Sequence, residues 1–323
     1  MNQPIWECGN VGNIALIVLA TLMILIVIGL GFAGNFFYHI AVGLNDKEFI
    51  EPTIVEGEYP LDDPWRVERM WYEKAKRQIL TIQSTDGLTL SAIYMEENPA
   101  SKKVAILAHG YTGDLKEMAP YSKLYAEMGF NILVPDARGH GMSEGDYIGF
   151  GWHERKDYLQ WIQLLLEKVG KDAEIALFGI SMGGATVMNV SGEELPSNVK
   201  VIVEDCGFSS VTSELTYQLK GMYRLPAFPL IPVTSLITKI RANYWFGEAD
   251  SVAQVKKNKV PILFIHGEED KFVPKEMVYE VYEANASSKE LYISPKANHA
   301  QAYQENKEAY KKVVQEFVST YIK

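Results

Sequence analysis

The chain has 323 residues, of which 47% are hydrophobic and 22% are charged, a composition typical of a folded globular protein. Its formal net charge is -10 and it contains no run of basic residues, so we expect no nucleic-acid partner. Cys8 and Cys206 lie far apart and form no Cys/His cluster. We therefore expect neither a disulfide framework nor a structural zinc site.

The first element in chain order is an apolar segment, residues 13–34, with the sequence NIALIVLATLMILIVIGLGFAG. No charged residue lies between Glu7 and Asp46, and the apolar stretch has about 20 residues, enough to cross a bilayer as a helix. The polar stripe of an ordinary surface helix is missing. We expect residues 1–44 to form an N-terminal transmembrane anchor, which makes the chain a single-pass membrane protein.

A cleaved signal peptide is the competing interpretation, because Gly31, Phe32 and Ala33 resemble a cleavage site. No lysine or arginine precedes the apolar segment, and the segment is long for a signal peptide, so an uncleaved signal anchor is favoured. The nearest positive charge is Lys47, which by the positive-inside rule would keep the C-terminal domain in the cytoplasm. A single lysine leaves the side of that domain open, extracellular or cytoplasmic.

Residues 45–77 are predicted to be a linker followed by a packing helix. Four breakers, Pro52, Gly57, Pro60 and Pro64, interrupt the polar first part. Beyond it, short apolar runs alternate with helical patterns, which favours a mostly parallel sheet with helices on both faces. The predicted strands are residues 78–83, 88–95, 104–108, 131–135, 175–180, 199–203, 261–265 and 290–293. The predicted helices are residues 115–128, 155–169 and 209–223, with another beginning at Met182.

One interval breaks this alternation. Residues 206–259 separate two strands and contain the apolar, proline-rich stretch RLPAFPLIPVTSLITKIRANYWFG. A long insertion between sheet strands typically forms a lid or a binding wall. We therefore expect a lid-like insertion within a domain that spans residues 78–323.

Ser181 lies at the junction between a predicted strand and a predicted helix, within the pattern Gly179-x-Ser181-x-Gly183. A nucleophile at such a junction requires a tight turn, and glycines on both sides remove collisions with the neighbouring backbone. The N–H groups of the following helix favour negative charge near the serine. The context predicts that Ser181 is a nucleophile rather than an ordinary turn residue.

A serine nucleophile requires a base and an orienting acid. His299 follows the last predicted strand, and Asp270 follows the strand before it, in the chain order Ser, Asp, His expected for this arrangement. We expect Ser181, His299 and Asp270 to form a catalytic triad. Asp205, at the end of another strand, is the alternative acid.

The oxyanion of an acyl-transfer intermediate requires two N–H donors. We expect them from Met182, directly after the nucleophile, and from Tyr111, which follows a strand in the sequence AILAHGYTGD. Gly110 allows this turn to approach Ser181. His109 precedes the proposed nucleophile, so a supporting role in the turn is expected for it.

Five motifs in order resemble the α/β-hydrolase family: HGY at residues 109–111, DARGHGMS at 136–143, GISMGG at 179–184, HGEEDKFVP at 266–274, and the pair Asn298-His299. The resemblance covers residues 78–323. Within that family, the chain is similar to bacterial membrane-anchored serine hydrolases related to serine aminopeptidase-like and prolyl-oligopeptidase-like esterases. The resemblance implies that residues 136–143 form a structural loop.

We expect the protein to be a carboxylesterase-like serine hydrolase that cleaves carboxylic esters. The anchor and the apolar insertion favour lipid-like or thioester substrates. A serine peptidase of the same fold is the alternative. A non-catalytic, membrane-tethered binding protein is the third reading, and it predicts a damaged triad. We expect a small-molecule ester substrate and neither a cofactor nor a metal, while the oligomeric state stays open.

Overall fold

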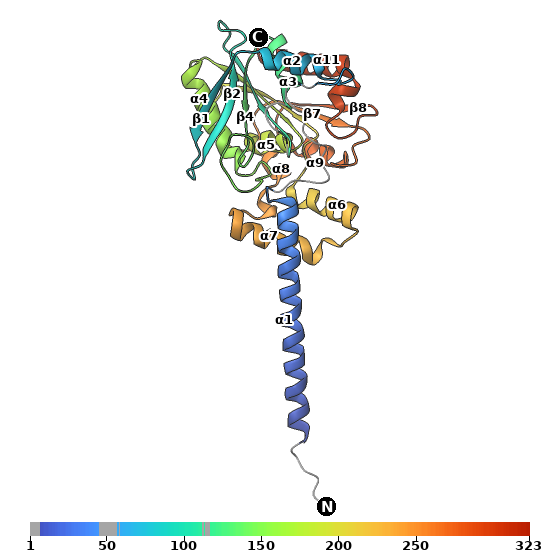
Figure 1. The fold of residues 1–323 in the computed structure, drawn as a ribbon. Helices are drawn as coiled ribbons and strands as arrows, with labels where there is room; N and C mark the ends of the chain where they lie inside the picture. The colour runs from blue at the N-terminus through green and yellow to red at the C-terminus, as the bar shows by residue number, and fades with distance from the viewer. Residues whose placement is uncertain (1–6, 45–56, 58, 112, 114–116) are drawn as a thin grey trace, which may run out of the picture.

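A computed structural model describes residues 7–44, 57, 59–111, 113 and 117–323, with the side chains given from Asn13 onward. Most of the predicted linker, and the side chain of Cys8, lie outside the described residues. Figure 1 shows a domain of strands and helices, from which one long helix projects.

Helix α1 spans Glu7–Ala41 and is longer at both ends than the predicted 13–34. Its side chains are exposed as far as Gly29, and continuous packing begins near Gly34. A Cβ atom on Gly34 would lie 2.6 Å from Cγ1 of Val233, so this glycine permits a close helix contact. The prediction that the helix ends at Gly34 is wrong, because α7 packs against that position and supports two further turns.

The central sheet has eight strands in the order β1-β2-β4-β3-β5-β6-β7-β8. β2 pairs antiparallel with β1 and β4, and all other neighbours are parallel. Each predicted strand is confirmed within two residues at either end. The strands are β1 (Arg77–Gln83), β2 (Thr89–Met95), β3 (Lys103–Ala108), β4 (Asn131–Pro135), β5 (Glu174–Ile180), β6 (Val199–Asp205), β7 (Ile262–Gly267) and β8 (Lys289–Ser294).

Two hydrophobic cores lie on the two faces of the sheet. One contains side chains from α2 (Arg66–Lys74), α3 (Ala119–Glu127), α10 (Ala302–Glu305) and α11 (Lys307–Tyr321). The other contains side chains from α4 (Glu154–Lys168), α5 (Met182–Ser191), α8 (Ser251–Val255) and α9 (Glu276–Ala284). Helix α3 begins later than the predicted 115, since Pro120 favours the first turn of a helix.

The insertion between β6 and β7 forms α6 (Val211–Tyr223), α7 (Ala227–Ala242) and the short 3-10 helix η1 (Phe246–Glu248) before α8. Figure 1 shows α6 and α7 beside α1, between the sheet and the bare part of that helix. We call α6, α7 and η1 the cap. A third core joins Tyr38 and Val42 at the end of α1 to cap residues such as Phe246. The end of α1 is therefore packed into the domain.

Candidate active site

Ser181 occupies the sharp turn between β5 and α5. Its backbone has φ 55° and ψ -117°, a conformation that side chains with a Cβ rarely adopt. A Cβ atom on Gly179 would lie 2.0 Å from the carbonyl oxygen of Gly183, and one on Gly183 would lie 2.1 Å from that of Ala108. The two glycines therefore permit the turn, which is the steric reason behind the sequence pattern.

The structure brings Ser181, His299 and Asp270 together from three separate loops. The Oγ atom of Ser181 lies 2.8 Å from Nε2 of His299, although the two residues are 118 positions apart in sequence. The other ring nitrogen of His299, Nδ1, lies 2.8 Å from Oδ2 of Asp270. Each side chain is thus within hydrogen-bond distance of the next, in the order that proton transfer requires.

Asp270 is held by more donors than His299 alone. The backbone N–H groups of Phe272 and Val273 both donate to its Oδ1 atom at 2.9 Å. Burial of Asp270 works to raise its pKa, but hydrogen bonds from His266 and His299 lower the pKa to about 2. Its carboxylate is therefore ionised throughout the neutral range.

His266 is a site residue that the sequence reasoning missed. It is fully buried, and its Nε2 atom donates to the carbonyl oxygen of Val273 at 2.9 Å and lies 3.3 Å from Oδ2 of Asp270. Burial works to lower the pKa of His266, but its interactions with Asp270 raise the pKa above the ordinary value. The available signal was its position four residues before Asp270, at the end of β7.

Asp205 makes its side-chain hydrogen bond to Tyr310 and none to His299 among the described contacts. Its Oδ2 atom accepts a hydrogen bond from the hydroxyl of Tyr310 at 2.8 Å, and its side chain is fully buried. Burial raises the pKa of Asp205 to about 6. Only its backbone touches the nucleophile, since its carbonyl accepts the N–H of Ser181 at 2.8 Å. Of the two acids named from the sequence, Asp270 is the one in contact with the histidine.

The two predicted N–H donors lie on segments that flank Ser181. Met182 is the first residue of α5, where backbone N–H groups have no partner within the helix. A Cβ atom on Gly110 would lie 3.8 Å from Cβ of Ser181, so the turn before Tyr111 runs close to the nucleophile. A hydrogen bond of 2.7 Å joins Nε2 of His140 to the carbonyl oxygen of Tyr111 and holds this turn.

His109 makes hydrogen bonds that connect the same turn to a neighbouring loop. Its Nε2 atom accepts the backbone N–H of Ala137 at 2.9 Å, and its Nδ1 atom lies 2.8 Å from the carbonyl oxygen of Gly110. Burial lowers the pKa of His109 to about 3, so the ring is neutral. His109 therefore lies in the turn, as its place in the sequence suggested, and makes no hydrogen bond to Ser181 among the described contacts.

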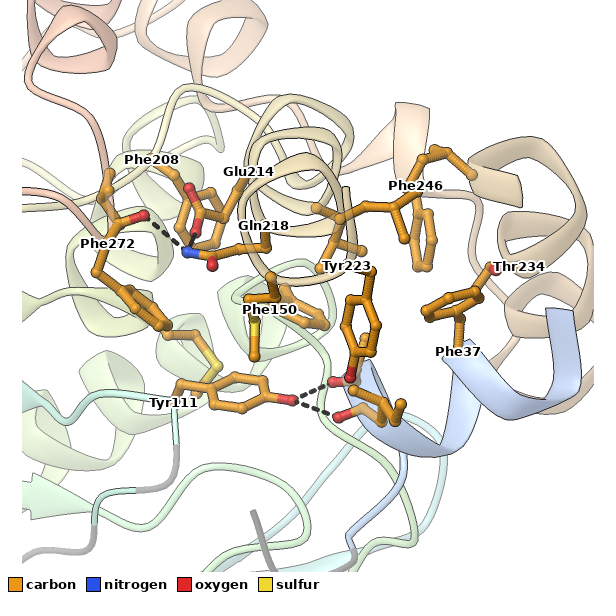
Figure 2. A pocket seen from close by; sticks show the side chains of 18 of the residues that line it. Phe37, Tyr111, Phe150, Phe208, Glu214, Gln218, Tyr223, Thr234, Phe246 and Phe272 are labelled. Carbon is orange, nitrogen blue, oxygen red and sulfur yellow. Dashed lines mark hydrogen bonds between the residues drawn. The ribbon is translucent and has the colours of Figure 1, made fainter. Parts of the chain in front are cut away.

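A pocket of about 840 Å³, counted to its open mouth, lies between Ser181 and the cap. Figure 2 shows aromatic side chains around it, with Phe37 coming from the end of α1. The hydroxyl of Tyr111 donates to the carbonyl oxygens of Ala41 and Ile40, the latter at 3.3 Å. The segment expected to supply an oxyanion donor is thus hydrogen-bonded to the N-terminal helix.

Glu214 is a buried acid in the wall of this pocket. The amide of Gln218 donates to its Oε1 atom at 2.8 Å and to the carbonyl oxygen of Phe272 at 2.7 Å, as Figure 2 shows. The Oε2 atom has no partner among the described residues. Burial raises the pKa of Glu214 to about 8, so the side chain is mostly neutral at pH 7.

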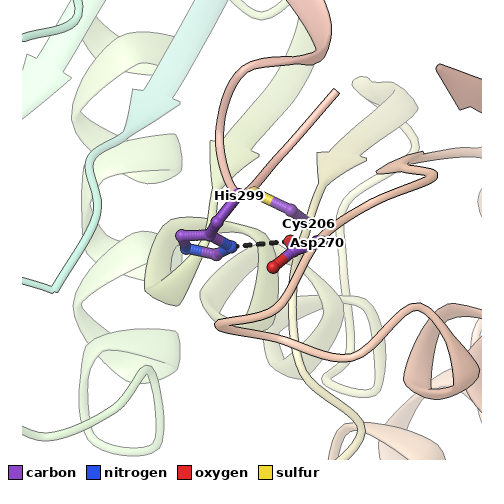
Figure 3. A group of neighbouring side chains, drawn as sticks. All are labelled: Cys206, Asp270 and His299. Atoms are coloured by element: carbon purple, nitrogen blue, oxygen red, sulfur yellow. Dashed lines mark hydrogen bonds and ion pairs between the residues drawn. The ribbon is translucent and has the colours of Figure 1, made fainter. Parts of the chain in front are cut away.

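Cys206, Asp270 and His299 offer ligand atoms within 4.8 Å of one another (Figure 3), a spacing that a metal ion could use. A metal-binding cysteine must be a thiolate. Burial raises the pKa of the Cys206 thiol well above its ordinary value, and the ring of His299 is already hydrogen-bonded on both sides. These three residues therefore fit a metal poorly.

Comparison with known proteins finds relatives that match most of the length of the chain. The family model described as X-Pro dipeptidyl-peptidase (S15 family) matches residues 62–244. The uncharacterised Bacillus subtilis protein YqkD is 30% identical over 247 residues, which cover 76% of this chain and 81% of YqkD. The Schizosaccharomyces pombe protein bem46 is 24% identical over 225 residues, 68% of this chain and 70% of bem46.

Solved structures agree in fold. An esterase of Pyrococcus furiosus superposes with a TM-score of 0.64 at 24% identity, covering 85% of this chain and 98% of the esterase. The Pyrococcus horikoshii acylaminoacyl peptidase gives a TM-score of 0.58 at 20% identity, covering 79% of this chain and 43% of the peptidase. At this level of identity, the likeness shows the shared α/β-hydrolase fold alone.

Proposed function

The chain belongs to the X-Pro dipeptidyl-peptidase (S15) family and has the α/β-hydrolase fold, and from this premise we propose that it is a carboxylesterase-like serine hydrolase. The observation that carries the proposal is the hydrogen-bonded series Ser181, His299 and Asp270, with both contacts at 2.8 Å, beneath an apolar pocket. A pocket of this kind suits the acyl part of an ester. Small-molecule esters are the proposed substrates.

In the proposed mechanism, Oγ of Ser181 attacks the ester carbonyl while Nε2 of His299 takes its proton. Asp270 accepts a hydrogen bond from Nδ1 of His299 and stabilises the charged ring. The N–H groups of Met182 and Tyr111 bind the oxyanion. His299 then protonates the leaving alcohol, and water releases the acid from Ser181 by the same path.

We also propose that α1 anchors the enzyme in a membrane. The segment Asn13–Ala41 has 29 residues with a mean hydropathy of 3.0 in its most apolar part, which is long enough to span a bilayer. The division then follows the sequence prediction: an anchor in residues 1–44, a linker and helix in 45–77, and the hydrolase domain in 78–323. An intact N-terminus in the purified protein, measured by mass spectrometry, would distinguish an anchor from a cleaved signal peptide.

A serine peptidase is the second candidate, and the S15 family match favours it. Hydrolysis of an ester and of an amide uses the same nucleophile, so the choice depends on the substrate rather than on the triad. The third reading, a tethered binding protein without catalysis, predicted a damaged triad. The unbroken contacts among Ser181, His299 and Asp270 argue against it.

The test is to label the full-length protein, in detergent, with a fluorophosphonate probe. We expect labelling of the wild type and of the control Ser319→Ala, whose side chain is exposed on α11, and none of Ser181→Ala. Labelling that survives in Ser181→Ala would overturn the nucleophile assignment. Hydrolysis of p-nitrophenyl butyrate and of an aminoacyl p-nitroanilide is then measured in parallel. Turnover of the ester supports the esterase, whereas turnover of the anilide alone would favour the peptidase.

A further inference from the structure

The last two turns of α1 belong both to the proposed anchor and to the pocket. Phe37, Ile40 and Ala41 line the same pocket as Ser181. The ring of Phe37 meets the ring of Tyr223 edge to face, with the centroids 5.3 Å apart (Figure 2). One helix therefore contributes both the exposed apolar segment and a wall of the substrate pocket.

The length of α1 determines at which depth of a lipid bilayer the cap would lie. The apolar segment Asn13–Ala41 has 29 residues, which span about 43 Å at about 1.5 Å per residue. A hydrocarbon core of about 30 Å needs only about 20 of them, which reaches roughly to Ala33. The helix begins to be covered at Gly34. The cap therefore begins where the polar headgroups of the lipids would lie.

The cap exposes several large apolar side chains. Phe228 and Ile240 on α7, the cap helix that packs against α1, are 78% and 75% exposed. Exposed apolar side chains also lie at the end of α6 and on α7: Met222, Tyr223, Leu225 and Leu236. A cluster of this kind beside an apolar helix fits a lipid boundary better than water.

The pocket leads from this boundary to the nucleophile. Ser181, at its inner end, is only 8% exposed, whereas Met222 and Tyr223 also line the pocket and are exposed. Phe37, which contacts Tyr223, lies one turn of α1 nearer the bare part of the helix than Ala41. One pocket therefore joins exposed cap side chains, the end of α1 and Ser181.

We propose that the substrate is an ester of one long acyl chain residing in the membrane, and that the chain enters the pocket along α1. This inference rests on the proposed esterase function. The acyl chain packs against Phe37 and Ile40, and the ester carbonyl reaches Ser181. The bond from Oγ to the acyl carbon forms as the ester C–O bond breaks, and the alcohol leaves with the proton from His299. Water then restores Ser181 and releases the fatty acid.

The first test measures chain-length preference in Phe37→Ala, with Phe36→Ala as a matched control. Phe36 is the adjacent residue, 54% exposed, and does not line the pocket. Since each buried methylene is worth roughly a fourfold factor, we expect the octanoyl-to-acetyl ratio of kcat/KM, with p-nitrophenyl esters, to fall about tenfold in Phe37→Ala. The ratio should stay at the wild-type value in Phe36→Ala. An equal ratio in the two variants would overturn the proposal.

The second test measures access from the bilayer. The full-length protein is reconstituted in phosphatidylcholine vesicles that carry monooleoylglycerol, and Ile240→Glu is compared with Ile79→Glu, an exposed isoleucine on β1 at the far edge of the sheet. We expect hydrolysis of monooleoylglycerol, relative to that of soluble p-nitrophenyl acetate, to fall about tenfold in Ile240→Glu alone. The same relative rate in both variants would refute membrane entry.

Failure of this inference is distinguishable from failure of the proposed function. Loss of fluorophosphonate labelling in Ser181→Ala, together with unchanged chain-length preference in Phe37→Ala, leaves the serine hydrolase in place and removes the role of α1. Labelling that persists in Ser181→Ala overturns the serine hydrolase itself. Labelling of Phe37→Ala by the same probe controls for folding of that variant.

Discussion

The contact between Asp270 and His299 makes Asp270→Asn the most informative substitution. An asparagine can still accept the N–H groups of Phe272 and Val273 through its Oδ1 atom. Its amide group, however, would face Nδ1 of His299, which then has to accept a hydrogen bond. The ring proton moves to Nε2, where it points at Oγ of Ser181, so His299 can no longer act as the base.

The magnitude follows from the same contacts. Replacing the acid of a serine triad by its amide lowers kcat by roughly ten thousandfold, equivalent to about 5 kcal/mol. The pKa of Asp270 is lowered from 3.8 to about 2, which corresponds to about 2 kcal/mol of stability at neutral pH. Because the folded pKa is the lower one, that stability is present above pH 4 and is lost as the pH falls toward 2.

The assay is kcat/KM for p-nitrophenyl butyrate with the full-length protein, together with urea unfolding at pH 7 and at pH 3. The matched control is Asp205→Asn, since Asp205 bonds to Tyr310 rather than to His299. We expect the larger catalytic loss in Asp270→Asn. A loss of less than about tenfold there, or a larger loss in Asp205→Asn, would refute the assignment of the acid.

Three further predictions follow from the pocket and the turn. Gly183→Ala should abolish soluble expression or lower the melting temperature sharply, because its Cβ would lie 2.1 Å from the carbonyl oxygen of Ala108, and a wild-type melting curve would contradict the steric argument. Glu214→Gln should stabilise the protein increasingly as the pH rises from about 5 to about 8, because the folded pKa of about 8 exceeds the ordinary 4.5 and the wild type loses stability between these two values. A stability difference between Glu214→Gln and wild type that does not vary with pH would contradict this assignment. Tyr111→Phe removes the hydrogen bond to Ala41 and should lower kcat/KM several-fold with unchanged fluorophosphonate labelling, whereas unchanged kcat/KM would show that the turn does not depend on α1.

Local sequence patterns predicted most of the secondary structure. The inner parallel strands were predictable because a strand buried on both faces of a parallel sheet is a short, continuous apolar run. The antiparallel pair β1 and β2 was predictable from the turn pair Asp86-Gly87 between two apolar stretches. The turn at Ser181 was predictable because a side chain at Gly179 would collide with the backbone of Gly183 in the same turn. The contact of Gly179 is close in sequence, so its residue preference is visible in the sequence itself, whereas Gly183 faces Ala108, which lies far earlier in the chain.

The extent of α1 was not predictable in the same way. The prediction took the helix only as far as the apolar segment itself, residues 13–34. In the structure, Gly34 allows α7 to approach, and the helix continues to Ala41. Whether a glycine ends a helix or accommodates a neighbour depends on a segment about 200 positions away, since Val233 supplies the contact.

The sequence by itself determined the order of the candidate catalytic residues along the chain: a serine in a glycine turn, then two acids near the ends of neighbouring strands, then a histidine close to the C-terminus. The sequence favoured Asp270 over Asp205 as the partner of His299, and the structure places Asp270 in that contact. The tertiary structure alone decided that α1 lines the same pocket as Ser181. Both acids lie near the ends of neighbouring parallel strands, Asp205 as the last residue of β6 and Asp270 three residues after β7. The loop after β7 brings Asp270 to His299, and the packing of α11 brings Tyr310 to Asp205.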